Sequence, residues 1–289
     1  MASFELSEPS TLEEAFALLD SDDPAIRPIG GGTALMLMMK AHLFQPVRLV
    51  SLRRVGPRFF GISPSDDGLF FRIGAMTTFS TIEHAPDLRM HFPVLARTMR
   101  NLANVRVRNV ATVGGNLAHA DPHLDLPPVW MALGAEAVIL NPDGECVVPV
   151  DDIFVGYYET SLRPKDLVAE IRVPVRRSWR AAYVKVTTRA AHDWPALGIA
   201  VAAEIVDGMI NDLRLVLSAA IDRPTRLLQA EAVLRGAPVD AANLRRAADA
   251  ALEEVTIEAD SQGSASYKQH LLRIYLARAI QSVAEEGAA

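Results

Sequence analysis

Two glycine-rich stretches contain the residues of this chain that are best suited to hold an anion. The first, Pro28–Leu35, contains three consecutive glycines, and the second, Thr112–Asp125, contains two. Adjacent glycines let the backbone approach a ligand closely and turn its N–H groups toward negative charge. The carboxylates of Asp121 and Asp125 can accept hydrogen bonds from sugar hydroxyls. Together the two stretches predict a site that holds a diphosphate from both sides, followed by a polyol.

Neither stretch fits the commoner nucleotide-binding motifs. The chain contains no Gly-x-x-x-x-Gly-Lys-Ser/Thr sequence, which excludes a P-loop, and Leu35 stands where a Gly-x-Gly-x-x-Gly fingerprint needs its last glycine. A Rossmann site is therefore not expected. The alternative for each stretch taken singly is a surface turn that binds nothing, because Gly-Gly-Asn is also a good turn sequence.

Other groupings of reactive residues carry weaker signals. His119, Asp121 and His123 alternate as metal ligands can, but they fall inside the second glycine-rich stretch and beside a proline, so we expect no metal there. No Ser/His/Asp or Cys/His arrangement indicates nucleophilic catalysis, and we predict no catalytic side chain. Cys146 is the sole cysteine, which excludes a disulfide framework and an iron–sulfur cluster held by this chain.

Composition is that of an ordinary globular protein. The chain has 289 residues, of which 50% are hydrophobic and 22% charged, enough for two or three subdomains. A net charge of -6 gives no basic footprint for nucleic acid. No apolar run approaches the roughly 20 residues that span a bilayer, and residues 1–5 do not resemble a signal peptide. We expect no membrane span and a cytoplasmic location.

Short strands alternate with helices through the first part of the chain. Ser10 and Glu13 are predicted to form a capping box at the start of the first helix. Residues 26–29 read as a strand that enters the first glycine-rich stretch, and residues 34–40 read as the helix that leaves it. Further strands are expected at 47–52, 69–74, 135–140, 145–150 and 166–173, with a helix at 92–102. This mixture favours an α+β fold over a doubly wound parallel sheet.

A different pattern follows the connector Pro174–Trp179. Residues 182–188, 199–206 and 209–217 alternate as strands, and Asp207-Gly208 between the last two is a strong hairpin signal. The rest of the chain carries helical apolar stripes. We predict a C-terminal domain with a three-stranded antiparallel sheet backed by helices.

Three separate motifs, in order, resemble one known family. They are Gly30–Leu35 continuing to Lys40, Val107–Asn109 leading into Thr112–Asn116 with Asp121 and Asp125, and Asp260–Leu271 with its Gly-Ser-Ala-x-Tyr-Lys-x-His-Leu core. The chain resembles the flavoprotein (medium) subunit of molybdenum hydroxylases, the group that includes the carbon monoxide dehydrogenase medium subunit and the FAD domain of xanthine dehydrogenase. The resemblance spans nearly the whole chain.

The resemblance implies a fold and a domain plan. It predicts a two-lobed FAD-binding domain of the vanillyl-alcohol-oxidase type over residues 1–176, with lobes at about 1–55 and 56–176. Residues 177–289 would form the C-terminal flavoprotein domain.

It also implies which residues contact FAD. The two glycine-rich stretches would hold the diphosphate, while Leu167 or Val168 would line an apolar flank of the cofactor. Lys185 would bring a cation to the flavin ring and so stabilise the anionic reduced form, the alternative being a solvated strand lysine. Trp194 would shield one face of the ring. The expected set is Ile29, Gly30, Gly31, Gly32, Thr33, Ala34, Leu35, Leu102, Thr112, Gly114, Gly115, Asn116, Ala118, Asp121, Asp125, Leu167, Val168, Lys185 and Trp194.

The implied function is electron relay within a multi-subunit molybdenum hydroxylase. FAD would sit on this chain, with molybdopterin on a large partner subunit and [2Fe–2S] on a small one, assembled as a dimer of heterotrimers. Electrons would pass from the [2Fe–2S] subunit through FAD to NAD, a quinone or oxygen. One alternative is a stand-alone FAD-dependent oxidoreductase, which predicts a histidine or cysteine attachment point or a substrate-facing acid/base set. Another is a scaffold subunit that has lost its flavin.

Overall fold

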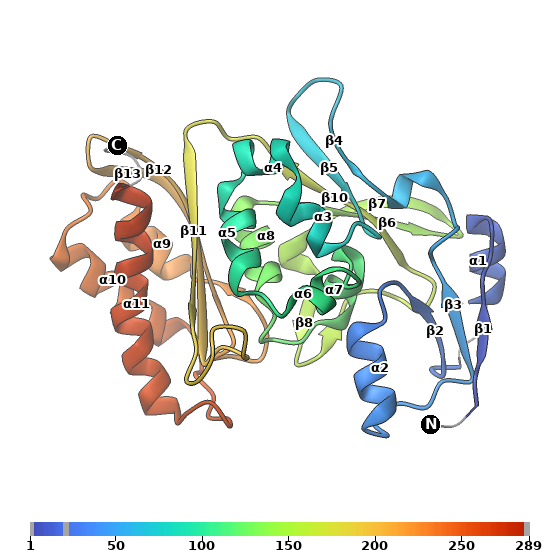
Figure 1. The fold of residues 1–289 in the computed structure, drawn as a ribbon. Coiled ribbons are helices and arrows are strands. Elements are labelled where there is room, and N and C mark those ends of the chain that lie inside the picture. The colour runs from blue at the N-terminus through green and yellow to red at the C-terminus, as the bar shows by residue number, and fades with distance from the viewer. Residues whose placement is uncertain (1–2, 20–22, 286–289) are drawn as a thin grey trace.

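The first glycine-rich stretch belongs to a small N-terminal unit. The computed structural model describes residues 3–19 and 23–285. Three parallel strands in the order β1-β3-β2 form its sheet: β1 (Glu5–Ser7), β3 (Arg48–Ser51) and β2 (Ile26–Ile29). Helices α1 (Leu12–Leu18) and α2 (Thr33–Lys40) complete the unit, which is blue in Figure 1. The strand at 26–29 is confirmed, and the helix predicted at 34–40 begins one residue earlier.

The second glycine-rich stretch belongs to a central unit formed on an antiparallel sheet. Its strand order is β4-β5-β10-β6-β7, with β4 (Ile62–Pro64), β5 (Phe70–Gly74), β10 (Leu167–Pro174), β6 (Glu136–Asn141) and β7 (Gly144–Pro149). Its helices are α3 (Phe79–His84), α4 (Pro86–His91), α5 (Pro93–Asn101), α6 (Val105–Arg108), α7 (Val113–His119) and α8 (Leu126–Leu133). Short 3-10 turns at Pro57–Phe59 and Val150–Asp152 and a hairpin, β8 (Phe154–Gly156) and β9 (Glu159–Thr160), complete it. The core is dry and apolar, with Trp130, Ile73 and Leu117 fully buried.

The C-terminal unit has one more strand than the sequence predicts. Its antiparallel sheet runs β11 (Trp179–Val186), β12 (Leu197–Val206), β13 (Met209–Ser218) and β14 (Thr225–Arg226). The predicted hairpin is present, and Asp207 and Gly208 at its turn have φ of 51° and 76°. The extra strand, β14, pairs with β13 through two residues only, too few to give an alternation signal in the sequence.

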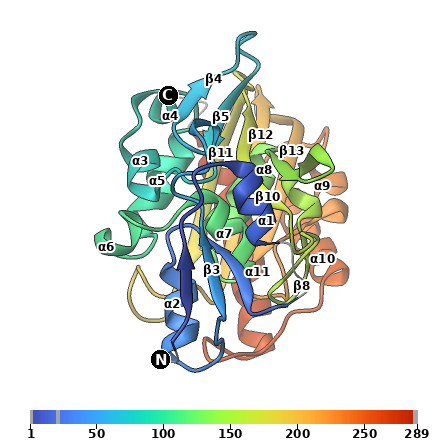
Figure 2. The same cartoon turned by 90° about the vertical axis from the view of Figure 1, so that its right-hand side faces the viewer.

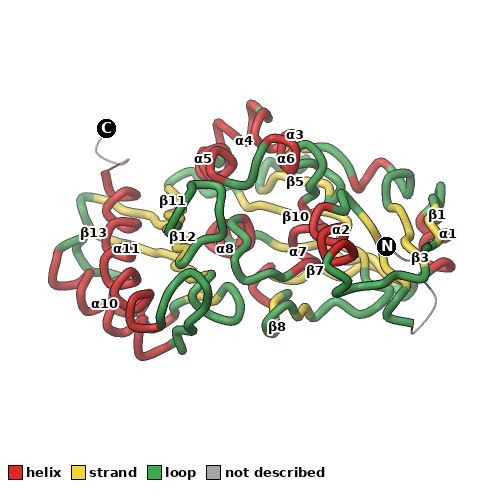
Figure 3. Tube along the Cα trace, turned by 60° about the horizontal axis from the view of Figure 1, so that its bottom comes forward, coloured by secondary structure: helices red, strands yellow, loops and turns green. Residues whose placement is uncertain are grey.

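The C-terminal sheet is covered on both faces. Helices α9 (Leu228–Leu234), α10 (Ala241–Glu254) and α11 (Ala265–Glu285) belong to this unit, and α11 packs on β11 and β12. The opposite face rests on α8 of the central unit, with α5 along β11 (Figure 1). Figure 2, turned by 90°, and Figure 3 both show α2 of the N-terminal unit beside α7 of the central unit.

Successive residues of β12 point to different cores. Ala200 and Ala202 belong to the central core, whereas Ile199 and Val201 belong to the C-terminal core. This is the period of two that a strand imposes. None of the helices in the described part of the chain has the length and apolar character needed to cross a bilayer.

The predicted capping box is wrong by one residue. Thr11 is the N-cap of α1, and its Oγ1 accepts a hydrogen bond from the Glu14 N–H at 3.1 Å. The Glu14 carboxylate in turn accepts from the Ser10 N–H at 2.7 Å. The sequence Ser-Thr-Leu-Glu-Glu fits the motif in two registers. Only the fold selects Thr11 and Glu14 in place of Ser10 and Glu13.

A buried carboxylate holds β13, β14 and α9 together, which gives a prediction about stability. Glu231 is 2% exposed, accepts the Leu215 N–H at 2.9 Å and pairs with Arg226 at 2.5 Å. Glu231→Ala leaves the Leu215 N–H without its acceptor and leaves the Arg226 guanidinium with only the more distant Asp151, at 3.7 Å, so we expect a loss of about 3 kcal/mol in the free energy of unfolding. Chemical denaturation of the full chain measures it.

The control for this substitution is Glu253→Ala, which removes an exposed carboxylate from α10. This variant is expected to change the free energy of unfolding by less than about 0.5 kcal/mol. Equal losses in the two variants would contradict a structural role for the Glu231 pair.

Candidate functional site

The first glycine-rich stretch is in direct backbone contact with Val110 and Ala111, the two residues that precede the second stretch. A Cβ atom added to Gly31 would lie 2.0 Å from the carbonyl oxygen of Val110, and one added to Gly30 would lie 2.7 Å from Thr112 Oγ1. Real Cβ atoms do not approach other atoms this closely, so a larger residue at Gly31 requires movement of the backbone, and one at Gly30 requires movement of the Thr112 side chain. The N-terminal and central units therefore touch at the residues expected to hold a diphosphate.

The second glycine-rich stretch is the first turn of a helix, not the turn that its sequence suggests. Thr112 is the N-cap of α7, and its Oγ1 accepts a hydrogen bond from the Gly115 N–H at 3.3 Å. Gly114 packs on Ala75, which would lie 2.6 Å from an added Cβ atom. Local propensity favours a turn at Gly-Gly-Asn, but the threonine cap and this close packing favour a helix.

Two helices begin at this junction. Gly32, with φ of 74°, is the N-cap of α2, and Thr112 is the N-cap of α7. The first turn of a helix has free N–H groups and a partial positive charge. Gly115 and Ala118, three residues apart on α7, are exposed on one side of the helix. The junction thus offers backbone donors and an open surface formed by small residues.

One buried polar atom at the junction has no partner. The Oδ1 atom of Asn116 is buried, and no hydrogen bond reaches it within the described part of the chain. Buried amides are almost always hydrogen-bonded in native proteins, and an unsatisfied one indicates a missing ligand or water. The close backbone contact, the two helix starts and the unsatisfied Asn116 amide all fit a bound dinucleotide.

The remaining expected site residues divide between the core and the surface. Leu102, Leu167 and Val168 are buried, at 6%, 2% and 6% exposure. Residues 29–35 are half-buried, whereas the Trp194 indole is 55% exposed. Asp121, at 3% exposure, lies in the loop after α7 and accepts hydrogen bonds from the His123 N–H and from His123 Nδ1.

Asp125 and Lys185 come together across the boundary between the central and C-terminal units. Asp125 Oδ2 lies 2.9 Å from Lys185 Nζ, and Asp125 Oδ1 accepts the Tyr183 hydroxyl at 2.8 Å. Lys185 Nζ also donates to the carbonyl of Asn101 at the end of α5, at 3.1 Å. The two charged side chains are 7% and 6% exposed. The alternative of a solvated strand lysine is therefore wrong.

Burial dominates the electrostatics of this pair. It raises the pKa of Asp125, an effect that the Lys185 charge and the hydrogen bonds from Lys185 and Tyr183 oppose. Burial and the neighbouring Asp125 charge raise the pKa of Tyr183 well above its usual value, so its hydroxyl stays protonated and donates. The result is an ammonium group held at one place by two oxygen atoms, Asp125 Oδ2 and the Asn101 carbonyl oxygen.

The sequence analysis missed Tyr183 and Asn101. Tyr183 lies two residues from Lys185 on one strand, and the period of two places both side chains on one face, a signal that was available. Asn101 contributes a backbone carbonyl, which no sequence pattern identifies. In residues 3–19 and 23–285, no cluster of histidine, cysteine and acidic side chains is arranged to hold a metal ion.

Comparison with known proteins identifies the family. A family model described as FAD binding domain in molybdopterin dehydrogenase matches residues 2–176. The chain belongs to this family. A second model, the C-terminal domain of the CO dehydrogenase flavoprotein, matches residues 182–283 of this FAD-binding chain.

Relatives align over nearly the whole chain. The nicotine 6-hydroxylase medium subunit of Paenarthrobacter nicotinovorans is 30% identical over 276 residues, covering 95% of each chain. The carbon monoxide dehydrogenase medium chain of Hydrogenophaga pseudoflava is 30% identical, covering 96% of each. These relatives are subunits of oxidoreductases, and the expectation of an oxidoreductase chain that binds FAD is confirmed.

Solved structures share the fold. Carbon monoxide dehydrogenase from Hydrogenophaga pseudoflava superimposes with a TM-score of 0.93 at 32% identity, covering 98% of this chain and 97% of that one. Quinoline 2-oxidoreductase from Pseudomonas putida 86 gives 0.90 at 28% identity, covering 99% and 98%. The predicted architecture, an FAD-binding domain followed by a C-terminal domain, is confirmed.

The buried Asp125–Lys185 pair predicts strong energetic coupling in this flavoprotein. Asp125→Asn and Lys185→Met each leave one buried charge without its partner, so each is expected to lower the free energy of unfolding by about 3 kcal/mol. The double variant should lose at least about 1 kcal/mol less than the sum of the two. Chemical denaturation of all four proteins measures the coupling.

The exposed pair Asp249–Arg273 is the matched control. Its side chains are 62% and 51% exposed and lie 2.5 Å apart. Screening by solvent limits the coupling of the equivalent variants, Asp249→Asn and Arg273→Met, to less than about 1 kcal/mol. Coupling no larger at Asp125–Lys185 than at this pair would refute the buried ion pair.

Proposed function

We propose that this chain is the FAD-binding electron-transfer subunit of a multi-subunit molybdenum hydroxylase, relaying electrons from a [2Fe–2S] partner subunit to an external acceptor. The observation that carries the proposal is the junction of the two glycine-rich stretches. There, two helices begin, an added Cβ atom finds no space at Gly31, and the Asn116 amide oxygen is buried without a partner. FAD supplies the redox chemistry when it is bound.

Each part of the junction has a role in binding the cofactor. Backbone N–H groups of residues 29–35 and 112–116 would donate to the diphosphate, assisted by the positive ends of α2 and α7. Asn116 would hydrogen-bond to a polar group of the cofactor. Ala118, exposed on α7, would lie along the ribityl chain. The absence of bulky side chains here is what allows the backbone donors to reach a ligand.

The boundary between units would orient the ring. The Lys185 ammonium is fixed by Asp125 and the Asn101 carbonyl, so its charge keeps one location whether or not a cofactor is bound. A fixed cation favours the anionic reduced flavin and costs no reorganisation. The buried side chains of Leu102, Leu167 and Val168 would exclude water from one flank of the cofactor.

We further propose that molybdopterin and [2Fe–2S] reside on a large and a small partner subunit, assembled as a dimer of heterotrimers. The relatives named above are medium subunits or chains of dehydrogenase complexes. The single cysteine of this chain, Cys146, cannot supply the thiolates that an iron–sulfur cluster needs. The two-domain division at residues 176/177 and a cytoplasmic location are part of the same proposal.

Affinity purification of the tagged chain from its native cell tests the assembly. We expect FAD absorbance together with molybdenum, iron and two further chains, one large and one small. A yellow chain that elutes alone, free of molybdenum and iron, and turns over a substrate would favour the stand-alone oxidoreductase. A colourless chain would favour the scaffold.

The glycine junction predicts a specific loss of cofactor binding. In Gly31→Ala, the new methyl group must displace the Val110 carbonyl, so the two glycine-rich stretches separate and the diphosphate loses donors. We expect the affinity for FAD to fall at least about tenfold, equal to about 1.4 kcal/mol. Titration of the full chain with FAD, followed by flavin fluorescence, measures the dissociation constant.

Gly68→Ala is the matched control. Gly68 also has a positive φ, 69°, but lies at the turn between β4 and β5 with open space around it. The substitution strains the backbone without touching the junction, so FAD affinity should stay within about twofold of the parent chain. Equal affinities in both variants would count against the junction as the diphosphate site.

A further inference from the structure

The residues just after α7 are attached to the C-terminal unit at three points. Asp125 bonds to Tyr183 and Lys185 of β11. The carbonyl of Pro122 accepts the Ala219 N–H at 3.0 Å. The third point is the side chain of His123, which the family resemblance gives no role.

His123 lies between two carboxylates from different units. Its Nδ1 is 3.1 Å from Asp121 Oδ1 in its own loop, and its Nε2 is 3.1 Å from Asp260 Oδ2 of the C-terminal unit. Ionised carboxylates only accept hydrogen bonds, so both ring nitrogens must donate, which makes the ring an imidazolium. The side chain is 10% exposed. Burial lowers the pKa of His123, but the hydrogen bonds and charges of the two carboxylates outweigh it and raise the pKa above its usual value.

The charges around His123 balance only when the ring is protonated. Asp260 Oδ2 also pairs at 2.7 Å with Lys268 on α11, which is 1% exposed. On the other side, Asp121 accepts a hydrogen bond from the Tyr158 hydroxyl, and burial lowers the pKa of nearby His119, so that His119 is neutral at neutral pH. Two carboxylates thus face two cations, and loss of the His123 proton leaves one buried negative charge in excess.

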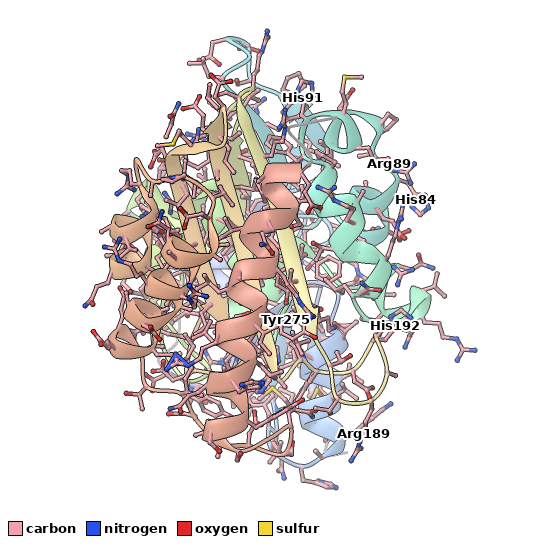
Figure 4. All side chains as sticks on the ribbon, turned by 90° about the vertical axis from the view of Figure 1, so that its left-hand side faces the viewer. His84, Arg89, His91, Arg189, His192 and Tyr275 are labelled. Atoms are coloured by element: carbon pink, nitrogen blue, oxygen red, sulfur yellow. The ribbon has the colours of Figure 1, made fainter. Side chains whose placement is uncertain are left out.

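The flat face of the same ring supports Trp194. The two rings are stacked, with centroids 5.1 Å apart and planes inclined by 13°. Trp194 lies on the loop between β11 and β12. Arg189 and His192, which belong to the same loop, are labelled in Figure 4. The same loop is hydrogen-bonded to the turn at residues 260–263, where the Thr188 hydroxyl donates to Gln262 Oε1 at 2.9 Å. The indole itself is 55% exposed and depends on His123 for its stacking partner.

We propose that His123 is a positioning residue of the flavin site. Its side chain joins the loop after α7 to the C-terminal unit and holds the Trp194 indole in place. The inference rests on the proposed FAD site. Protonated His123 satisfies both carboxylates and stacks on the indole as a cation. Because the pKa of His123 is raised on folding, the stabilisation that its protonated ring provides is complete at acid pH. It is lost as the pH rises through the raised pKa.

Tryptophan fluorescence of the full chain without FAD tests the stack. A protonated imidazole in contact with an indole quenches its emission, so emission should rise in one step, above the ordinary pKa of a histidine, as His123 loses its proton. Trp194→Phe and His123→Gln should both abolish the step. His192→Gln removes an exposed histidine from the same loop and should leave the step unchanged. A step that survives in His123→Gln overturns the proposal.

FAD titration tests the consequence for the site. At a pH below the fluorescence step we expect His123→Gln to weaken FAD binding about tenfold, and at a pH above the step the affinity of the parent chain should approach that of the variant. His123→Arg retains a cation and several donors, so it should bind more tightly than His123→Gln and show no affinity change over this pH range. A merely structural histidine would give neither this pH dependence in the parent chain nor this difference in FAD affinity between the two variants.

The outcomes separate the two proposals. If the parent chain binds no FAD at any pH while the fluorescence step is present, the proposed FAD site fails and the stack stands. If the parent chain binds FAD equally at both pH values and His123→Gln matches it, the positioning role fails and the FAD site stands. If His123→Gln does not fold, the pH dependence of FAD affinity in the parent chain and in His123→Arg still tests the positioning role.

Discussion

The backbone contact between Gly31 and the Val110 carbonyl fixes the geometry on which the rest of the proposed FAD site depends. It joins a parallel three-stranded unit to an antiparallel five-stranded one without any intervening side chain. Because the two backbones touch, the first turns of α2 and α7 begin side by side, and their free N–H groups can serve one ligand. A single Cβ atom at this point would move both helix starts. Glycine is required at position 31 because no side chain fits there, whereas glycine is favoured at position 32 because the φ angle there is positive.

Charged side chains mark the boundary between the central and C-terminal units at the site. The pair Asp125–Lys185 and the side chains of Asp121 and His123 are nearly removed from solvent. Buried ion pairs lose most of their Coulomb attraction to desolvation, so they add little net stability compared with apolar contacts. These ion pairs instead fix the positions of the charges, because each charged atom is satisfied in one arrangement only. At a redox site, position of charge is the property that matters.

Much of the fold could be predicted from local signals, but the contacts within the site could not. The strand at 26–29 and the hairpin at Asp207-Gly208 follow from alternation and turn chemistry, which act over a few residues. The helix at 113–119 was missed because Gly-Gly-Asn has turn propensity, and the packing of Gly114 on Ala75 that overrides it joins residues distant in sequence. The family motifs predict which stretches bind FAD, and they give no role to Tyr183 or His123, whose contacts with Asp125 and Asp260 form only in the folded chain.

The structure gives Asp125 a different role from the one that its sequence position suggests. Both carboxylate oxygens are engaged, Oδ1 by the Tyr183 hydroxyl and Oδ2 by the Lys185 ammonium, and the side chain is 7% exposed. A carboxylate so enclosed is poorly placed to accept from a sugar hydroxyl in addition. Its contribution to a bound flavin would pass through Lys185, whose ammonium it holds against the end of α5. Asp121 is enclosed in the same way by His123, so any effect of these two acidic residues on a bound cofactor would pass through the cation that each one holds.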